Sequence, residues 1–82
     1  MRKDVTAGSL EKALLSLGFV AIAVHSSHRT YRHASSGAMV VLPWQRRNET
    51  LSPANLVSVK RTLSEAGVLD RDSFDSLLEK AA

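Results

Sequence analysis

The stretch HSSHRTYRH, residues 25–33, holds every histidine of this 82-residue chain, together with arginines, a tyrosine and adjacent serines. Such side chains can transfer protons, attack electrophiles and bind anions. Three chemistries therefore deserve comparison: a metal site built from the histidines, a serine nucleophile activated by a histidine, and cleavage of RNA with a histidine as the base.

The first two chemistries fit the stretch poorly. A His-x2-His-x4-His spacing with no Cys, Asp or Glu nearby does not match the usual zinc patterns, and the chain contains no cysteine. Ser27 has His28 beside it as a base, but the stretch has no carboxylate to orient that histidine. We therefore expect neither a metal site nor a serine nucleophile.

Cleavage of RNA through its own 2′-hydroxyl requires less of the protein. The nucleophile belongs to the substrate, so the protein supplies a proton acceptor that works near neutral pH and cations for the charge that develops at phosphorus. His28 would be the acceptor, with Arg29 and Arg32 as the cations. The residue pattern by itself favours the alternative that His28 is an ordinary surface residue at the start of a strand.

Charge is unevenly distributed along the chain, whose net charge is +3. Residues 1–64 carry nine Lys or Arg against three Asp or Glu, whereas residues 65–82 carry two against five. A basic surface suits a polyanion such as nucleic acid, and it is equally compatible with a solvated face. Arg46 and Arg47 are expected in a polar loop. The same two alternatives apply to them: they either bind RNA phosphates or are simply solvated.

Composition indicates a globular protein without disulfides, since 44% of the residues are hydrophobic and cysteine is absent. The longest apolar run, Phe19 to Val24, is too short to cross a bilayer, and the N-terminal residues lack the apolar region of a secretory signal. We expect a cytoplasmic protein with no membrane segment.

The remaining pattern predicts the elements that position these residues. Ser9 is expected to cap a helix with Glu11 in its first turn, and Gly18 to end it. FVAIAVH, residues 19–25, is apolar on both faces and is expected to be a well-buried strand. RTYRH and AMVVLP predict two more strands, over residues 29–33 and 38–43.

Two further helices follow. Ser52 and Pro53 predict the start of one that Gly67 closes, and Asp70 caps a short third helix. The expected fold is α+β, a three-stranded antiparallel sheet with helices on one face, in the αβββα arrangement of double-stranded-RNA-binding domains plus a C-terminal helix. The chain reads as a single domain over residues 1–82, with its core in 9–69 and a helical extension in 70–82.

Strand alternation assigns the residues of the second strand to two faces. Tyr31 and His33 are expected to face the helices, whereas His28, Thr30 and Arg32 are expected on the open face.

Four segments in this order resemble the HicA, or YcfA-like, toxins of type II toxin-antitoxin systems: LLSLGF at 14–19, SSHRTYRH at 26–33, GAMVVLP at 37–43 and LVSVKRTLSEAGV at 56–68. The resemblance implies a small ribonuclease that cleaves mRNA, inhibits translation and is neutralised by a HicB-type antitoxin, without a metal or an organic cofactor. The catalytic histidine of the family falls on His28. The candidate RNA-binding residues are Ser27, Arg29, Arg32, Arg46 and Arg47.

The sequence departs from the family pattern in three ways. Ser26 occupies the position of a signature glycine, and Trp44 and Gln45 stand where many members have another histidine. The loop WQRRNETLS at 44–52 is longer than usual in the family, and the acidic third helix after Gly67 is an addition. The alternative function is therefore a non-catalytic module on the same fold, which binds RNA or an antitoxin.

Overall fold

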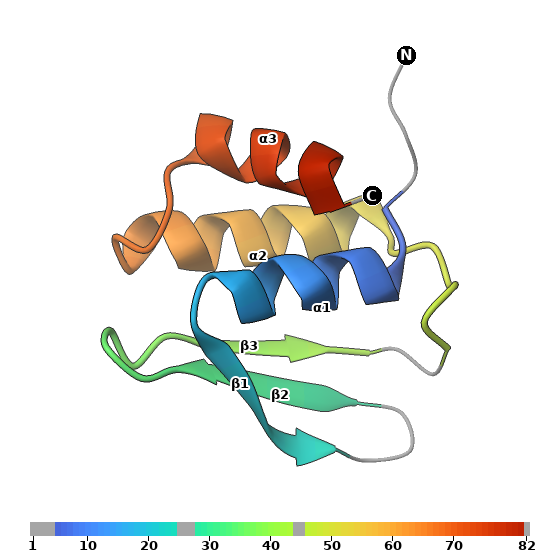
Figure 1. Cartoon of the computed structure of the whole chain (residues 1–82), viewed down its shortest axis with the longest axis horizontal. Helices are drawn as coiled ribbons and strands as arrows, with labels where there is room; N and C mark the ends of the chain where they lie inside the picture. The colour runs from blue at the N-terminus through green and yellow to red at the C-terminus, as the bar shows by residue number, and fades with distance from the viewer. Residues whose placement is uncertain (1–4, 25–27, 44–45, 82) are drawn as a thin grey trace.

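The computed structural model describes residues 5–24, 28–43 and 46–81, and it has the predicted α+β architecture (Figure 1). The elements along the chain are α1 (Ala7–Ser16), β1 (Phe19–Val24), β2 (Arg29–His33), β3 (Met39–Leu42), α2 (Pro53–Glu65) and α3 (Arg71–Ala81). The strands form an antiparallel sheet in the order β1-β2-β3. The helices lie on one side of this sheet, with α3 packed on α1 and α2, so the opposite side forms an open sheet face.

The core lies between the sheet and the helices, and each of the six elements contributes to it. Tyr31 stands at its centre, because β2 is the middle strand and Tyr31 pairs with Ala21 of β1 and Val40 of β3. The α3 helix buries Phe74 and Leu78 in the same core, as its apolar spacing predicts. The third helix is thus part of the packed structure.

Several helix ends confirm the sequence signals. The Ser52 side chain caps α2 with Pro53 in the first turn, and Asp70 accepts a hydrogen bond from the Ser73 N–H at 2.8 Å. Gly18 and Gly67 end their helices with φ of 97° and 73°, which side-chain-bearing residues rarely adopt.

The predicted start of α1 was wrong. Thr6, not Ser9, is the N-cap, and its Oγ1 accepts a hydrogen bond from the Ser9 N–H at 3.2 Å. The cause is tertiary, because Thr6 forms an antiparallel bridge with Thr50 that fixes the chain entering the helix. Glu11 therefore lies in the second turn and not in the first.

The prediction that the first strand is well buried was also wrong. Only Phe19 of β1 is buried, while Val20, Ile22 and Val24 are at least half exposed. The reason is that β1 is an edge strand of a sheet covered on one face only, and its register shifts between Ala21 and Ala23.

Among the described residues, none of the helices combines the length and the apolar character needed to cross a bilayer.

Candidate functional site

His28 lies directly before β2, and its side chain is exposed. Since Arg29 pairs with Leu42, His28 stands at the end of the sheet where β2 begins and β3 ends. The start of α1 and the segment after β3 lie at this same end (Figure 1). Five residues singled out in the sequence fall outside the described residues: His25, Ser26, Ser27, Trp44 and Gln45.

A buried carboxylate, Glu11 of α1, organises this end of the molecule. The Tyr31 hydroxyl donates a hydrogen bond to Glu11 Oε2 at 2.6 Å, and Arg29 Nη1 reaches the same oxygen at 3.2 Å. Arg47 donates from its Nη1 to the other oxygen, Oε1. Glu11 therefore ties α1, β2 and the loop after β3 to one another.

The contacts of Glu11 determine its charge state. Burial by itself would raise the pKa of Glu11, but the hydrogen bonds from Tyr31 and Arg47, with the charges of Arg47 and Arg29, lower the pKa below its ordinary value. Glu11 is consequently ionised at neutral pH. Two arginines against one carboxylate leave the cluster with a net positive charge.

The structure separates the arginines that were expected to act together. Arg29 lies on the helix side of β2 with Tyr31, where both contact Glu11. Arg32 is exposed on the open sheet face, between Val20 and Met39 of the neighbouring strands. Arg29 is thus grouped with Arg47, and Arg32 belongs to a different surface.

The loop that carries Arg46 and Arg47 is anchored on the start of α1. The Gly8 N–H donates to the Arg47 carbonyl and the Ala7 N–H to the Glu49 carbonyl, both at 2.8 Å. The Glu49 carboxylate also accepts a hydrogen bond from the Arg46 N–H at 2.8 Å. These contacts hold the loop beside α1.

Glu11 is the site residue that sequence reasoning missed. A signal for it was present, because Glu11 falls four residues after Ala7 and three before Leu14, on the apolar stripe of α1. A charged residue at such a position is rarely buried unless it is paired. The stripe indicates that Glu11 has a partner, although it does not identify which residue.

His33 has a structural role, as its predicted position facing the helices indicates. Its Nε2 contacts the Leu17 carbonyl at 3.0 Å, so this nitrogen carries the proton and Nδ1 is left to accept. Nδ1 lies 2.8 Å from the Ser36 hydroxyl, and the ring packs on Phe19 with centroids 5.1 Å apart. His33 thereby joins the end of α1 to the turn between β2 and β3.

Replacing His33 with alanine is expected to lower the free energy of unfolding by about 1–3 kcal/mol, because the Leu17 carbonyl loses its donor and Phe19 loses a ring contact. Urea unfolding followed by circular dichroism measures the change. The matched control is His28→Ala, for which a change within about 0.5 kcal/mol is expected at an exposed position. Equal losses in the two variants would contradict this division between the two histidines.

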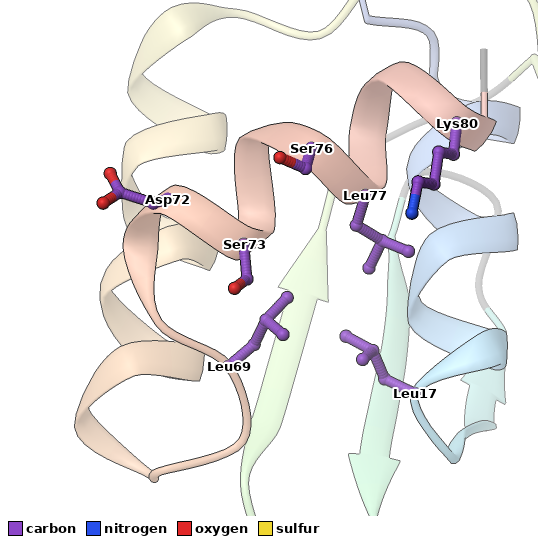
Figure 2. Close-up of a pocket in the computed structure, with 7 residues that line it drawn as sticks. All are labelled: Leu17, Leu69, Asp72, Ser73, Ser76, Leu77 and Lys80. Atoms are coloured by element: carbon purple, nitrogen blue, oxygen red, sulfur yellow. The ribbon is translucent and has the colours of Figure 1, made fainter.

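A hollow of about 340 Å³ lies between α3 and the end of α1, away from these residues (Figure 2). Three leucines line it together with Asp72, two serines and Lys80, and the leucine side chains point toward its centre. None of the candidate site residues that the structure describes contributes to its lining. Within residues 5–24, 28–43 and 46–81, no group of three or more His, Asp or Glu side chains is placed to hold a metal ion.

Comparison of the chain with protein-family models, with curated proteins and with solved structures gave no match.

Proposed function

We propose that this protein is a HicA-like toxin, an endoribonuclease that cleaves mRNA in the cytoplasm and so inhibits translation. The observation that carries the proposal is an exposed histidine, His28, at the end of the sheet where Glu11 holds two arginines. The segments that resemble HicA toxins supply the reaction class. Neutralisation by a HicB-type antitoxin belongs to the same proposal.

The proposed reaction requires one proton transfer by the protein and stabilisation of charge at phosphorus. The His28 imidazole takes the proton of the RNA 2′-hydroxyl, and the oxygen attacks the adjacent phosphorus. The bond from phosphorus to the 5′ oxygen breaks, water protonates that oxygen, and the hydroxide that is left takes the proton back from His28. The products are a 2′,3′-cyclic phosphate and a 5′-hydroxyl end.

Arg47 and Arg29 are the cations suited to the negative charge that builds up on the phosphate oxygens. The Arg47 side chain is 63% exposed although it contacts Glu11, so its guanidinium can reach a bound phosphate. Because Glu11 fixes the position of both guanidinium groups, little reorganisation is needed when the charge develops.

The function is tested with purified protein and an end-labelled single-stranded RNA in the presence of EDTA. We expect cleavage products with 2′,3′-cyclic phosphate ends, identified by mass spectrometry, and growth arrest when the protein is expressed in bacteria. An RNA with a single 2′-deoxy nucleotide at the cleaved position is the control, and it should resist cleavage there. Intact RNA together with unaffected growth would rule out the nuclease and favour a non-catalytic module.

A specific observation supports an antitoxin-binding surface as well. On the open sheet face, Val20, Met39 and Val41 are at least half exposed around Arg32 and Thr30. Contiguous exposed apolar residues are typical of protein-binding surfaces. We assign this face to the HicB-type antitoxin, and the His28 end of the sheet to RNA.

Replacing Val41 with lysine is expected to weaken binding of a HicB-type antitoxin by about 30-fold or more, because the charge would be buried at an apolar contact. The matched control is Val57→Lys on α2, where the exposed fraction is 59% against 57% for Val41. Biolayer interferometry with the purified antitoxin measures both affinities. Equal affinities for the two variants would place the antitoxin elsewhere.

A further inference from the structure

A second hollow, of about 350 Å³, lies beside the start of α1, and we call it the α1 hollow. Its lining consists of Thr6, Gly8, Ser9, Lys12, Arg47 and Asn48. The side chains among these are two cations, two hydroxyl groups and an amide, and no carboxylate of the described residues lines the hollow. All of them can donate hydrogen bonds, which suits an anionic ligand.

The backbone of Arg47 is held at the α1 hollow by its contact with Gly8. The Gly8 N–H donates to the Arg47 carbonyl at 2.8 Å, and a Cβ on residue 8 would stand 3.1 Å from that carbonyl oxygen. Glycine thus allows the loop to lie against the helix. Arg47 is positioned there before any ligand arrives.

Lys12 is the cation of the α1 hollow whose charge is not paired with an acid of the described residues. Glu11 already accepts hydrogen bonds from Arg47, Arg29 and Tyr31, and among the described residues Lys12 forms no salt bridge. Lys60 of α2 provides a contrast, since its Nζ lies 3.2 Å from Asp75. The positive charge at the start of α1 is therefore available to a ligand.

The cations, and not the end of the helix, form this site. The first N–H groups of α1 are occupied, because those of Ala7 and Gly8 donate to the carbonyls of Glu49 and Arg47. The Ser9 N–H donates to the Thr6 hydroxyl oxygen. Recognition of an anion must come from the side chains, chiefly Lys12 and Arg47.

We propose that the α1 hollow binds a phosphate group of the RNA strand next to the one that is cleaved at His28, with Lys12 as its cation and Arg47 between the two phosphates. The identity of the polyanion rests on the proposed function. The connection to His28 runs through Glu11, because Arg47 shares this carboxylate with Arg29, the residue that follows His28. A strand that extends from His28 along this cluster passes Arg47 and reaches Lys12.

The test measures binding of a 2′-O-methyl single-stranded RNA, which cannot be cleaved because its 2′ oxygen is blocked. Fluorescence anisotropy at several salt concentrations gives the affinity and its salt dependence. For Lys12→Gln we expect an affinity about 3- to 10-fold lower, and a slope of log K against log salt that is smaller by about 0.7, the value for one phosphate contact on a single strand. The cause is the loss of one cation from the α1 hollow.

The control is Arg71→Gln, which removes the same charge from the first turn of α3, at the opposite end of the molecule from the start of α1 (Figure 1). We expect its affinity and slope to match those of the wild type. Equal effects of the two substitutions, or an unchanged Lys12→Gln, would overturn the proposal.

The outcome also separates this inference from the proposed function. If the wild type cleaves RNA and Lys12→Gln binds normally, the nuclease stands and the phosphate site is wrong. If the wild type leaves RNA intact while binding depends on Lys12 and not on Arg71, the phosphate site stands and the nuclease is wrong.

Discussion

Replacement of His28 with alanine should abolish RNA cleavage and the growth arrest that follows from it. A general base contributes about 10²- to 10⁴-fold to the rate of such a reaction, and alanine has no group to accept the 2′-hydroxyl proton. His28 is exposed just before β2, so its loss should leave the fold intact. Single-turnover cleavage of labelled RNA measures the rate, and circular dichroism verifies the fold.

Binding provides the control for this experiment. Because Arg29 and Arg47 keep their contacts with Glu11, His28→Ala should bind the uncleavable 2′-O-methyl RNA with nearly the wild-type affinity. Cleavage by His28→Ala at the wild-type rate would show that another group takes the proton. Loss of binding together with cleavage would assign His28 to RNA recognition.

Local signals were sufficient to predict much of the fold. The second strand, residues 29–33, was predicted with the bounds that the structure gives it, and alternation along it correctly sent Tyr31 and His33 to the helix side. The cap of α2 at Ser52 was also predicted. These features depend on residues that are close together in the chain, and their physical causes are visible in the sequence.

The features that were missed depend on contacts between distant parts of the chain. Burial of β1 depends on its place in the sheet and on the layers around the sheet. An apolar strand is buried on both faces only when layers cover both sides of the sheet. The contacts of Glu11 come from residues 18, 20 and 36 positions away. No local pattern identifies such partners, so the cluster that organises the candidate site emerges only in three dimensions.

Replacement of Glu11 with glutamine should lower the free energy of unfolding at pH 7 by about 2 kcal/mol. Hydrogen bonds to a charged group contribute about 1.5–3 kcal/mol, and the buried Tyr31 hydroxyl keeps an acceptor in the amide oxygen. The partial exposure of Arg29 and the greater exposure of Arg47 reduce the effect, since solvent screens both arginines. Urea unfolding measures the loss, with the exposed Glu65→Gln as the control.

The stability difference between wild type and Glu11→Gln should depend on pH. The pKa of Glu11 is lowered in the folded protein, so folding favours the ionised form and the stabilisation is complete above the pKa of the unfolded chain. This stabilisation begins to be lost when the pH falls below about 4.3, where an ordinary glutamate titrates. The loss continues as the pH falls through the lower pKa that Glu11 has in the folded protein. The difference should therefore shrink from pH 7 to pH 3, and a constant difference would show that the charge of Glu11 contributes nothing.

Cleavage by Glu11→Gln distinguishes a stabilising role from a positioning role. If Glu11 only stabilises the fold, the rate should return to the wild-type value at temperatures where the variant is fully folded. We expect the maximal rate of Glu11→Gln at these temperatures to remain at least tenfold below that of the wild type. The reason is that no carboxylate then fixes the guanidinium groups of Arg29 and Arg47, so each must be ordered when the transition-state charge develops. His28 then still accepts the proton, while the charge at phosphorus is left to mobile cations.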